Sequence, residues 1–353
     1  MVGAGIVGAS IAWHLAQKGA AVTVIDRGAP GGGVTAASFA WIGGGVTAES
    51  FARINVEHGQ PEPNHALRRL AIADWRRLEG ELGGRLSIDW TGALTWSADA
   101  AATERLVRDH PGLQLAERAE LARREPALLH PPACAAFAPE EGAVDAAAAT
   151  AALLQAAAVP VVHGEVLAVA TSGGRITGLR LPGEQVEADV VVLAAGTAAV
   201  PLALGLGVLL PVDASPAVLL RFATAARLPR HILSGPRFEV RQPTATTLLA
   251  AEDYPDDGDV GRVAAAAVRT LQGAFRGGEA LSLVETRVGR RPIPADDLPI
   301  VGAVPSIAGL YVAVMHAGVN LAPAVGRLAA DEILKGTSAP ALAHCRPERF
   351  GAA

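Results

Sequence analysis

The stretch GAGIVG at residues 3–8 decides the fold of this 353-residue chain. Gly3 permits a sharp turn after a strand, Gly5 leaves room for a pyrophosphate next to the backbone, and Gly8 lets a helix pack against the sheet. An anion held there would meet the free N–H groups and the positive dipole end of the helix that follows. The stretch therefore predicts a dinucleotide-binding turn.

The residues on either side of the turn support this prediction. Residues 6–18 have a helical pattern, Gly19 suits a helix C-terminus, and residues 21–25 form a β-branched run typical of a strand. Asp26 ends that strand, at the distance where a carboxylate accepts hydrogen bonds from the ribose hydroxyls of a dinucleotide. The alternative is a tight turn in an α/β protein that binds no ligand.

The first strand is expected to be unusually short. Only Met1 and Val2 precede Gly3, whereas a strand usually has about five residues. Either the natural start lies upstream or the strand is stunted, and we expect the neighbouring strands near Ile25 and Val192 to lose backbone partners. We interpret the apolar start as part of the turn and not as a signal peptide, because no basic segment precedes it.

Composition limits the classes of protein that fit. Half of the residues are hydrophobic and the net charge is −5, which predicts one large or two medium domains and no basic footprint for nucleic acid. Cys134 and Cys345 are far apart, without a CxxC motif or a histidine cluster, so we expect neither a disulfide framework nor a metal site. Gly, Pro or polar residues interrupt every long apolar run, and we expect a cytoplasmic protein without an integral membrane segment.

Hydrophobic periodicity predicts the elements of the remaining chain. Helices are expected at residues 64–82, 101–109, 116–125, 144–157, 260–275 and 322–335. Strands are expected at residues 161–166, 188–196, 218–222, 238–241 and 247–251, and hairpins at 87–97 and 166–181. Asp74 falls at the edge of the apolar stripe of its helix, where we expect it to meet solvent, and Pro323 falls in the first turn of the last helix.

The order of these elements predicts an α/β fold with an α+β substrate part. A Rossmann-like dinucleotide domain with a parallel central sheet is expected at residues 1–48, 140–204 and 286–353. A second domain with a mostly antiparallel sheet is expected at residues 49–139 and 205–285. The small-residue loop at 28–47 can lie against the cofactor, and the alternative is a flexible surface loop.

Four motifs in order give the chain a specific resemblance. They are the glycine turn with Asp26, the Ala-Gly-Thr turn at 195–197, the Gly-x-Arg-Pro element at 289–292, and Gly309-Leu-Tyr-Val followed by a glycine loop and Leu-Ala-Pro at 321–323. Over essentially its whole length the chain resembles the flavin-dependent family of D-amino acid oxidase, glycine oxidase, sarcosine oxidase and D-amino acid dehydrogenases. The resemblance implies FAD as cofactor and oxidation of a C–N bond in an amino acid or N-substituted amino acid.

The resemblance also implies which residues contact FAD. They are Gly3, Gly5, Ile6, Val7, Gly8, Asp26, Arg27, Ala37, Ser38, Val166, Ala195, Gly196, Thr197, Gly318, Val319, Asn320 and Leu321. The helix that starts near Leu321 is expected to stabilise negative charge on the reduced flavin. Val166 could equally be ordinary strand core. Both cysteines lie far from the Gly289 element, so FAD is expected to bind non-covalently.

Arg291 and His316 are the candidate catalytic residues. Arg291 precedes the proline of the Gly-x-Arg-Pro element and resembles the carboxylate clamp of the family, a role that suits a bidentate guanidinium. If Arg291 were a structural ion-pair residue, the clamp would have to be Arg241 or Arg221. His316 could hydrogen-bond the substrate or the flavin, and its alternative is a structural loop histidine.

The expected reaction passes a hydride to flavin N5 and gives an imine that water hydrolyses. Oxygen or another redox partner would reoxidise the flavin, and neither lysine, Lys18 or Lys335, lies in a segment that resembles an oxygen-activating site. Three alternatives stay open: a flavoprotein of the same fold with a non-amine substrate, a NAD(P)-dependent dehydrogenase, and a non-catalytic flavoprotein.

Overall fold

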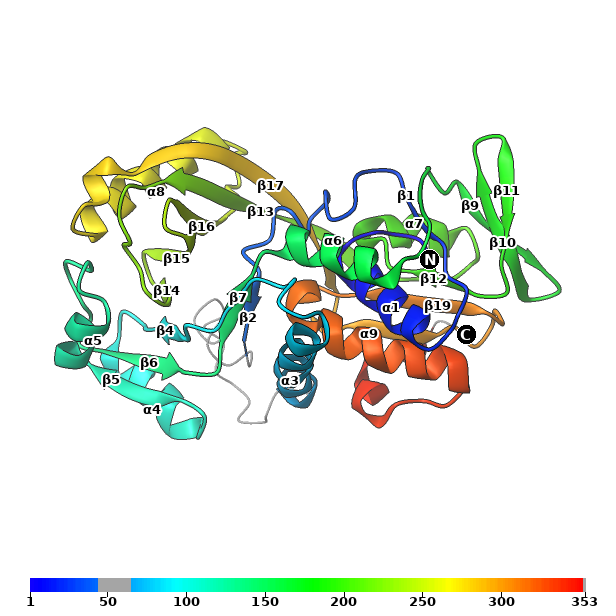
Figure 1. The fold of residues 1–353 in the computed structure, drawn as a ribbon, viewed down its shortest axis with the longest axis horizontal. Helices are drawn as coiled ribbons and strands as arrows, with labels where there is room; N and C mark the ends of the chain where they lie inside the picture. The colour runs from blue at the N-terminus through cyan, green and yellow to red at the C-terminus, as the bar shows by residue number, and fades with distance from the viewer. Residues whose placement is uncertain (44–64, 352–353) are drawn as a thin grey trace.

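A computed structural model describes residues 1–43 and 65–351 of the chain. Two groups of elements are visible in Figure 1, and the long strands β13 and β17 lead from one group to the other. An eight-stranded sheet with helix α8 forms the left-hand group. Helices α1 and α9 and the sheet that carries β12 and β19 form the right-hand group.

The described residues form helices of very different length. The α-helices are α1 (Ile6–Gln17), α3 (His65–Glu81), α4 (Ala100–Asp109), α5 (Arg118–Arg124), α6 (Ala146–Ala157), α7 (Ala199–Leu204), α8 (Val260–Ala274) and α9 (Gly318–Lys335). Short 3-10 helices are η1 (Gly196–Ala198), η2 (Gly278–Ala280), η3 (Pro340–Cys345) and η4 (Pro347–Phe350).

The strands belong to a mainly parallel sheet, a mainly antiparallel sheet and two small antiparallel sheets. They are β1 (Val24–Asp26), β2 (Trp41–Ile42), β3 (Ile88–Asp89), β4 (Ala93–Thr95), β5 (Gln114–Glu117), β6 (Cys134–Ala138), β7 (Gly142–Val144), β8 (Val161–His163), β9 (Ala168–Ser172), β10 (Arg175–Leu181), β11 (Glu184–Glu187), β12 (Val191–Leu193), β13 (Val212–Ala223), β14 (Ile232–Gly235), β15 (Phe238–Thr244), β16 (Thr247–Asp253), β17 (Ser282–Pro294), β18 (Ile300–Ala303) and β19 (Leu310–Val314). The expected α/β fold with a parallel sheet and a mostly antiparallel sheet is confirmed.

The parallel sheet is assembled from distant parts of the chain. Strand β1 pairs in parallel with β8, and β12 pairs in parallel with β19, whose other edge carries the antiparallel β18. Val2 forms parallel bridges to Ile25 of β1 and to Leu193 of β12, so it joins the two halves. This sheet positions the glycine turn, because the turn follows directly from its central segment.

The expectation that strands near Ile25 and Val192 lack backbone partners is wrong. On one side, Val2 N donates to Val192 O at 2.9 Å and Ala194 N donates to Val2 O at 2.9 Å. On the other side, Gly3 N donates to Ile25 O and Ile25 N donates to Met1 O, both at 2.9 Å. Two residues suffice because every backbone group that faces a neighbouring strand is used.

The mainly antiparallel sheet has the strand order β17-β13-β16-β15-β14-β4-β6-β5, in which only the β14–β4 pair is parallel. Its outer face carries apolar side chains such as Phe222 and Leu248, which pack with Leu271 of α8 in one core cluster. Residues directly opposite each other in neighbouring strands share a face. By this register the inner face carries a different set of side chains: Thr95, Ser234, Glu239, Arg241, Leu219 and Arg291.

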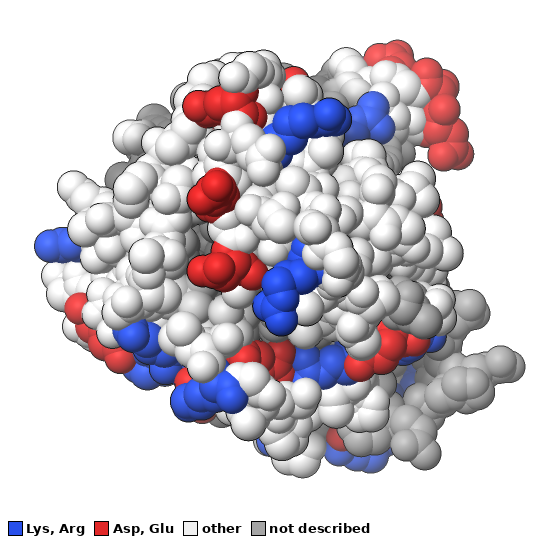
Figure 2. Space-filling view, turned by 90° about the vertical axis from the view of Figure 1, so that its right-hand side faces the viewer, with Lys and Arg blue, Asp and Glu red and all other residues white. Residues whose placement is uncertain are grey.

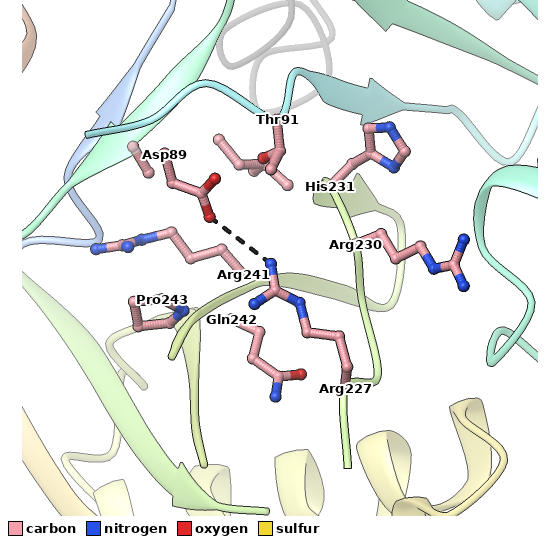
Figure 3. A pocket seen from close by; sticks show the side chains of 10 residues that line it. Asp89, Thr91, Arg227, Arg230, His231, Arg241, Gln242 and Pro243 are labelled. Atoms are coloured by element: carbon pink, nitrogen blue, oxygen red, sulfur yellow. Dashed lines mark ion pairs between the residues drawn. The ribbon is translucent and has the colours of Figure 1, made fainter. Parts of the chain in front are cut away.

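The inner face packs against the small sheet of β2, β7 and β3. Arg241 makes the polar link, since its Nε donates to Phe39 O at 2.6 Å and its Nη2 donates to Val144 O at 3.1 Å. Figure 3 shows Arg241 beside a small cavity across which Arg227 reaches toward Asp89, with 3.7 Å between the charged atoms. Burial lowers the pKa of Arg241 to about 10, and its charge is held by backbone carbonyls.

Three local predictions are wrong. Residues 87–97 form no hairpin, because β3 pairs with β7 while β4 pairs with β6 and β14. Residues 114–117 form strand β5, so the next helix begins only at Arg118. Helix α9 begins at Gly318, which puts Pro323 inside the helix and not in its first turn. The hairpin of β9 and β10 is confirmed. Thr47 and Asn64, which ended an expected loop and began an expected helix, lie outside the described residues.

Charged side chains of both signs are interspersed on the face shown in Figure 2, without a continuous patch of one sign. No helix of the described ranges is long and apolar enough to cross a membrane.

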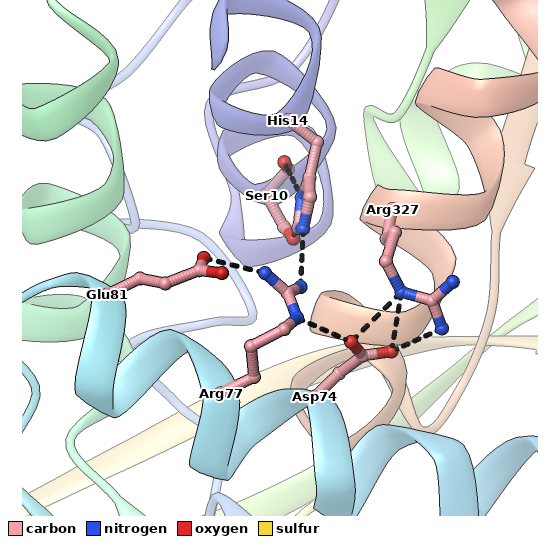
Figure 4. A network of polar contacts seen from close by, with 6 residues as sticks. All are labelled: Ser10, His14, Asp74, Arg77, Glu81 and Arg327. Atoms are coloured by element: carbon pink, nitrogen blue, oxygen red, sulfur yellow. Dashed lines mark hydrogen bonds and ion pairs between the residues drawn. The ribbon is translucent and has the colours of Figure 1, made fainter. Parts of the chain in front are cut away.

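Asp74 does not meet solvent as expected; it is 5% exposed. Its carboxylate accepts hydrogen bonds from Arg327 of α9, at 2.8 to 3.1 Å, and from Arg77 Nε at 2.9 Å (Figure 4). Arg77 also reaches His14 of α1, where its Nη2 lies 2.9 Å from Nε2. These hydrogen bonds and ion pairs thus connect α3 to α1 and to α9. They lie beside a groove of about 740 Å³ at the C-terminal half of α1.

His14 must be neutral in this network. An arginine can only donate, so His14 Nε2 accepts, and Nδ1 donates to Ser10 O at 2.8 Å. Burial, with Arg77 nearby, lowers the pKa of His14 to about 4. The unfolded chain protonates this histidine near pH 6.5. The contribution of His14 to the free energy of unfolding is therefore fully present above pH 6.5 and is lost as the pH falls toward 4.

We expect His14→Gln to reduce the loss of stability in acid, because glutamine can accept from Arg77 but does not titrate. Between pH 7.5 and pH 5 the unmodified protein should lose about 2 kcal/mol through this group, and the variant should not. Denaturant unfolding of both proteins at the two pH values measures the difference. Equal losses would show that His14 is not the responsible group.

Candidate cofactor and substrate site

The glycine turn has no room for side chains at two of its three glycines. Gly3 has φ +104°, and a Cβ there would lie 2.5 Å from Ala194 O. A Cβ on Gly8 would overlap the carbonyl oxygen of Gly3. A Cβ on Gly5 would meet only Thr35 Oγ1, at 3.3 Å, so Gly5 borders space that a pyrophosphate can use.

Two side chains fix the shape of the turn. Asp26 Oδ2 accepts from Ala4 N at 2.7 Å, and its Oδ1 accepts from Gly28 N at 2.8 Å. Thr35 Oγ1 accepts from Ile6 N at 3.3 Å. Each carboxylate oxygen of Asp26 keeps a second lone pair for a ribose hydroxyl.

The N-termini of α1 and α9 meet at this turn. A Cβ on Gly318, the first residue of α9, would lie 3.4 Å from Val7 Cγ2 in the first turn of α1. Neither helix has a side-chain N-cap or an acidic residue in its first turn, so their leading N–H groups are uncapped by side chains. Two such ends favour bound anionic groups.

The first turn of α9 is anchored from two directions. Asn320 Nδ2 donates to Gly43 O at 2.7 Å, and Trp75 Nε1 donates to Asn320 O at 3.0 Å. Asn320 Oδ1 is buried and has no hydrogen-bond partner among the described residues. A buried acceptor without a donor is costly, and a ligand that donates there would relieve the cost.

The Ala-Gly-Thr turn lies beside the Gly-x-Arg-Pro element. Gly196 has φ +57°, and a Cβ there would lie 3.9 Å from Pro292 Cγ. A Cβ on Gly289 would lie 3.0 Å from Ala37 Cβ. Segments from four distant parts of the chain therefore converge around the glycine turn, and together they fit a flavin dinucleotide.

The other residues expected to contact FAD differ in their surroundings. Arg27 is exposed, 3.9 Å from Glu165, and Val166 packs at the edge of the parallel-sheet core. Ser38 Oγ accepts from Ala40 N at 3.0 Å. His316 is exposed at the end of β19, and its carbonyl accepts from Gly318 N at 2.7 Å. Among Arg27, Val166, Ser38 and His316, it is His316 that lies beside the N-terminus of α9, two residues before Gly318.

Arg291 lies half-buried on the inner face of the antiparallel sheet. Its Nη2 donates to Ser215 Oγ at 3.0 Å and to Pro216 O at 3.5 Å. Its Nε is buried without a partner, and no described carboxylate lies within ion-pair distance of it. Arg290, in contrast, is exposed on the opposite face. The guanidinium thus keeps a buried donor for a ligand.

The two alternative clamps are already engaged. Arg241 holds the carbonyls of Phe39 and Val144, and its guanidinium lies 5.5 Å from the Phe39 ring centroid. Arg221 pairs with Glu285 at 3.3 Å. Of these three arginines, Arg291 is the one with a buried Nε that has no acceptor among the described residues.

Sequence reasoning missed four polar side chains near these groups. Thr35 was inside a loop singled out only for its small residues. Thr95, Ser234 and Glu239 lie on the inner face, and no single strand shows them together. Glu239 Oε2 accepts from Ser234 Oγ at 3.2 Å. Burial raises the pKa of Glu239 to about 7; Ser234 and Arg291 oppose that rise.

The site also lacks the features of a metal centre. Within the described ranges, no group of three or more His, Cys, Asp or Glu side chains could hold a metal ion. The buried Cys134 and Cys345 are free thiols.

The fold and the converging glycine segments define an FAD-binding oxidoreductase. The chain belongs to the family of FAD dependent oxidoreductases, whose model matches residues 1–332. It depends on FAD, and the alternative of a nicotinamide-dependent dehydrogenase is set aside.

The relatives of the chain agree with this class. The uncharacterized oxidoreductase YurR of Bacillus subtilis (strain 168) is 28% identical over 360 residues, covering 95% of this chain and 94% of the relative. The structure of iminodiacetate oxidase from Chelativorans sp. BNC1 is 25% identical with a TM-score of 0.81, covering 98% of both chains. Glycine oxidase from Geobacillus kaustophilus, 24% identical, shares the fold with a TM-score of 0.85, covering 99% of this chain and 97% of that one.

We expect Asp26→Ala to weaken FAD binding about 10- to 100-fold, since hydrogen bonds to a charged group contribute roughly 1.5–3 kcal/mol. Losing the bond to Ala4 N should also loosen the turn. The flavin retained after gel filtration and the FAD dissociation constant measure the effect. Glu184→Ala, which removes an exposed carboxylate from β11, is the matched control and should bind FAD normally. Normal FAD affinity of Asp26→Ala would exclude a cofactor role for this residue.

Proposed function

We propose that this flavoprotein oxidises the C–N bond of an amino acid or N-substituted amino acid of the D-amino acid, glycine or sarcosine type. The observation that carries the proposal is Arg291, which has a buried, unpartnered Nε on the inner face of the sheet. A guanidinium in that state matches the planar, bidentate geometry of a carboxylate. A substrate held by its carboxylate leaves its α-carbon and amine free to point toward the cofactor.

The roles of the chain follow from this geometry. We propose that the glycine turn, Asp26 and the leading residues of α1 hold the dinucleotide part of FAD, and that Gly318 to Leu321 face the flavin ring. When bound, FAD supplies the flavin N5 that accepts the hydride from the substrate α-carbon. Arg291 binds and orients the carboxylate, and the N-terminus of α9 stabilises negative charge that develops next to it. The imine product hydrolyses in water.

The proposal also assigns the segments of the chain to two domains. Residues 1–48, 140–204 and 286–353 would form the FAD-binding domain, and residues 49–139 and 205–285 the substrate domain. His316 would hydrogen-bond the substrate or the flavin from the end of β19. The protein would work in the cytoplasm, with FAD bound non-covalently.

The electron acceptor would be oxygen or another redox partner. Both lysines of the chain contact Asp331, at 3.1 Å from Lys18 and 2.7 Å from Lys335. They lie at the C-terminal ends of α1 and α9, and the N-termini of these helices meet at the glycine turn. An oxygen-activating lysine next to the flavin is therefore not part of this proposal.

A substrate panel tests the proposed reaction. Glycine, sarcosine, D-alanine, L-proline and iminodiacetate would each be added to the FAD-loaded protein without oxygen. Loss of the oxidised flavin absorption with at least one of them is the expected result. A protein that keeps its oxidised spectrum with every amine, but is reduced by a non-amine substrate, would replace this proposal with the non-amine alternative.

We expect Arg291→Leu to lower kcat/KM for carboxylate-bearing amines roughly 30- to 1000-fold, with most of the change in KM. The lost charge-assisted contacts correspond to about 2–4 kcal/mol. Arg290→Leu removes the neighbouring arginine from the opposite face and is the matched control, which should keep normal kinetics. If both variants behave alike, or if Arg291→Leu oxidises amines normally, Arg291 is not the clamp.

A further inference from the structure

We propose that Glu239 is a second substrate-binding residue, which accepts the proton of the substrate ammonium group and so prepares the amine for oxidation. This inference rests on the proposed function above. It adds a residue that approaches the nitrogen end of the substrate to the arginine that binds the carboxylate end.

The strand register places Glu239 on the same face as Arg291. Glu239 of β15 is opposite Ala251 of β16, Ala251 is opposite Leu219 of β13, and Leu219 is opposite Arg287 of β17. Arg287 and Arg291 are four residues apart in β17, so their side chains share this face. The field of Arg291 reaches the Glu239 carboxylate and opposes the rise of its pKa. Between the two side chains the inner face presents Ala217, Ala251 and Leu219, together with the exposed Asp253, which is opposite Ala217.

The carboxylate of Glu239 is not engaged by a protein cation. Its described hydrogen bond is the one from Ser234 Oγ, at 3.2 Å, and it forms no ion pair with a described Arg, Lys or His. A carboxylate that is half-buried without a counter-ion is unusual, because burial of unpaired charge is costly. A cationic substrate group would supply the missing charge.

A second unpartnered group lies beside Glu239. Thr95 of β4 is opposite Ser234, which is opposite Glu239, so the three side chains are neighbours on the inner face. Thr95 is fully buried, and its Oγ1 has no hydrogen-bond partner among the described residues. Native proteins rarely leave a buried hydroxyl unmatched. Glu239 therefore lies between Thr95 and Arg291, each of which has a buried polar atom without a hydrogen-bond partner among the described residues.

The charges around Glu239 set its proton affinity. Burial is the largest cause that raises its pKa to about 7, and Asp253 and Glu252 of β16 add to the rise. The hydrogen bond from Ser234 and the charge of Arg291 lower it. Near neutral pH the carboxyl group thus exists in both forms, which suits a group that takes up and releases a proton.

The chemistry requires such a step. An amino acid binds mainly as an ammonium ion, whose nitrogen has no lone pair to form the C=N bond when hydride leaves the α-carbon. In the proposed step one N–H bond breaks, its electron pair stays on nitrogen, and the proton forms an O–H bond with Glu239. The carboxylic acid then loses this proton to water. Arg291 and Glu239 together select a zwitterion with the amine next to the carboxylate.

The pH dependence of kcat/KM tests the step in the FAD-loaded enzyme, with an amine that reduces the unmodified protein. The unmodified enzyme should gain activity as the pH rises through about 7, where Glu239 ionises. In Glu239→Gln this rise should move up to the amine's own pKa, and kcat/KM at pH 8 should fall about 100-fold, as for loss of a general base.

Glu252→Gln is the matched control. Glu252 lies next in sequence to Ala251, so it points to the other face, and burial also raises its pKa to about 7. This variant should keep the rise near pH 7, moved to a slightly lower pH because a negative neighbour of Glu239 is removed. If Glu239→Gln keeps the same rise as the unmodified enzyme, the inference is wrong while the proposed function stands. If no amine reduces the unmodified protein, both are wrong.

Ligand binding gives a readout that does not need turnover. Acetate carries the carboxylate alone, whereas glycine adds the ammonium group. Glu239→Gln should bind acetate as tightly as the unmodified protein does and bind glycine at least 10-fold more weakly, measured by the rapid perturbation of the oxidised flavin absorption that precedes any reduction. Equal losses for both ligands would overturn the inference. Thermal melting and FAD content check that Glu239→Gln is folded. If it is not, Ser234→Ala tests the same carboxylate, because loss of the Ser234 hydrogen bond should raise the pH of half-maximal activity.

Discussion

The close approach of Gly3 to Ala194 is the constraint on which the rest of the structure depends. Any side chain at Gly3 would collide with the carbonyl group of Ala194, and any side chain at Gly8 would collide with the carbonyl oxygen of Gly3. The turn is therefore locked between the end of β12 and the start of α1, and its hydrogen bonds to Asp26 and Thr35 leave little freedom. Everything that could hold a dinucleotide is arranged around this fixed point.

The mainly antiparallel sheet is held in place by a different interaction. Arg241 crosses from the inner face of the antiparallel sheet to the carbonyls of Phe39 and Val144. Because a guanidinium cannot give up its charge readily even when burial lowers its pKa, these carbonyls must stay in contact with it. The sheet that carries Arg291 and Glu239 is thus anchored to the segments that follow the glycine turn. A reaction between a bound amine and a bound cofactor needs this fixed relation, since small displacements of reacting atoms slow a reaction strongly.

Much of the fold could be predicted from the sequence, because local patterns decide it. Three local patterns each predict the structure of their own segment: the glycine spacing, the β-branched run before Asp26 and the Ala-rich sequence of α6. The errors came where pairing is decided at long range: β3 and β4 are adjacent in sequence but join different sheets, and Asp74 meets arginines from its own helix and from α9. Arg291 could be singled out as a candidate from its motif alone. Glu239 could not, because its neighbours on the inner face come from strands that are far apart in the chain, and only the register brings them together.

The meeting of α1 with α9 has a consequence for how the protein is made. Both helix N-termini are needed at the glycine turn, and a Cβ on Gly326 of α9 would overlap the Ser10 hydroxyl of α1, so the two helices fit only in one close arrangement. Yet α1 leaves the ribosome early, and α9 follows only after nearly all of the described chain has been synthesised. During translation the apolar surface of α1 is without this partner, and the cofactor has no complete site to bind. Cofactor capture is therefore a late event in biosynthesis, and the apolar surface of α1 stays open to non-native contacts until α9 has folded against it.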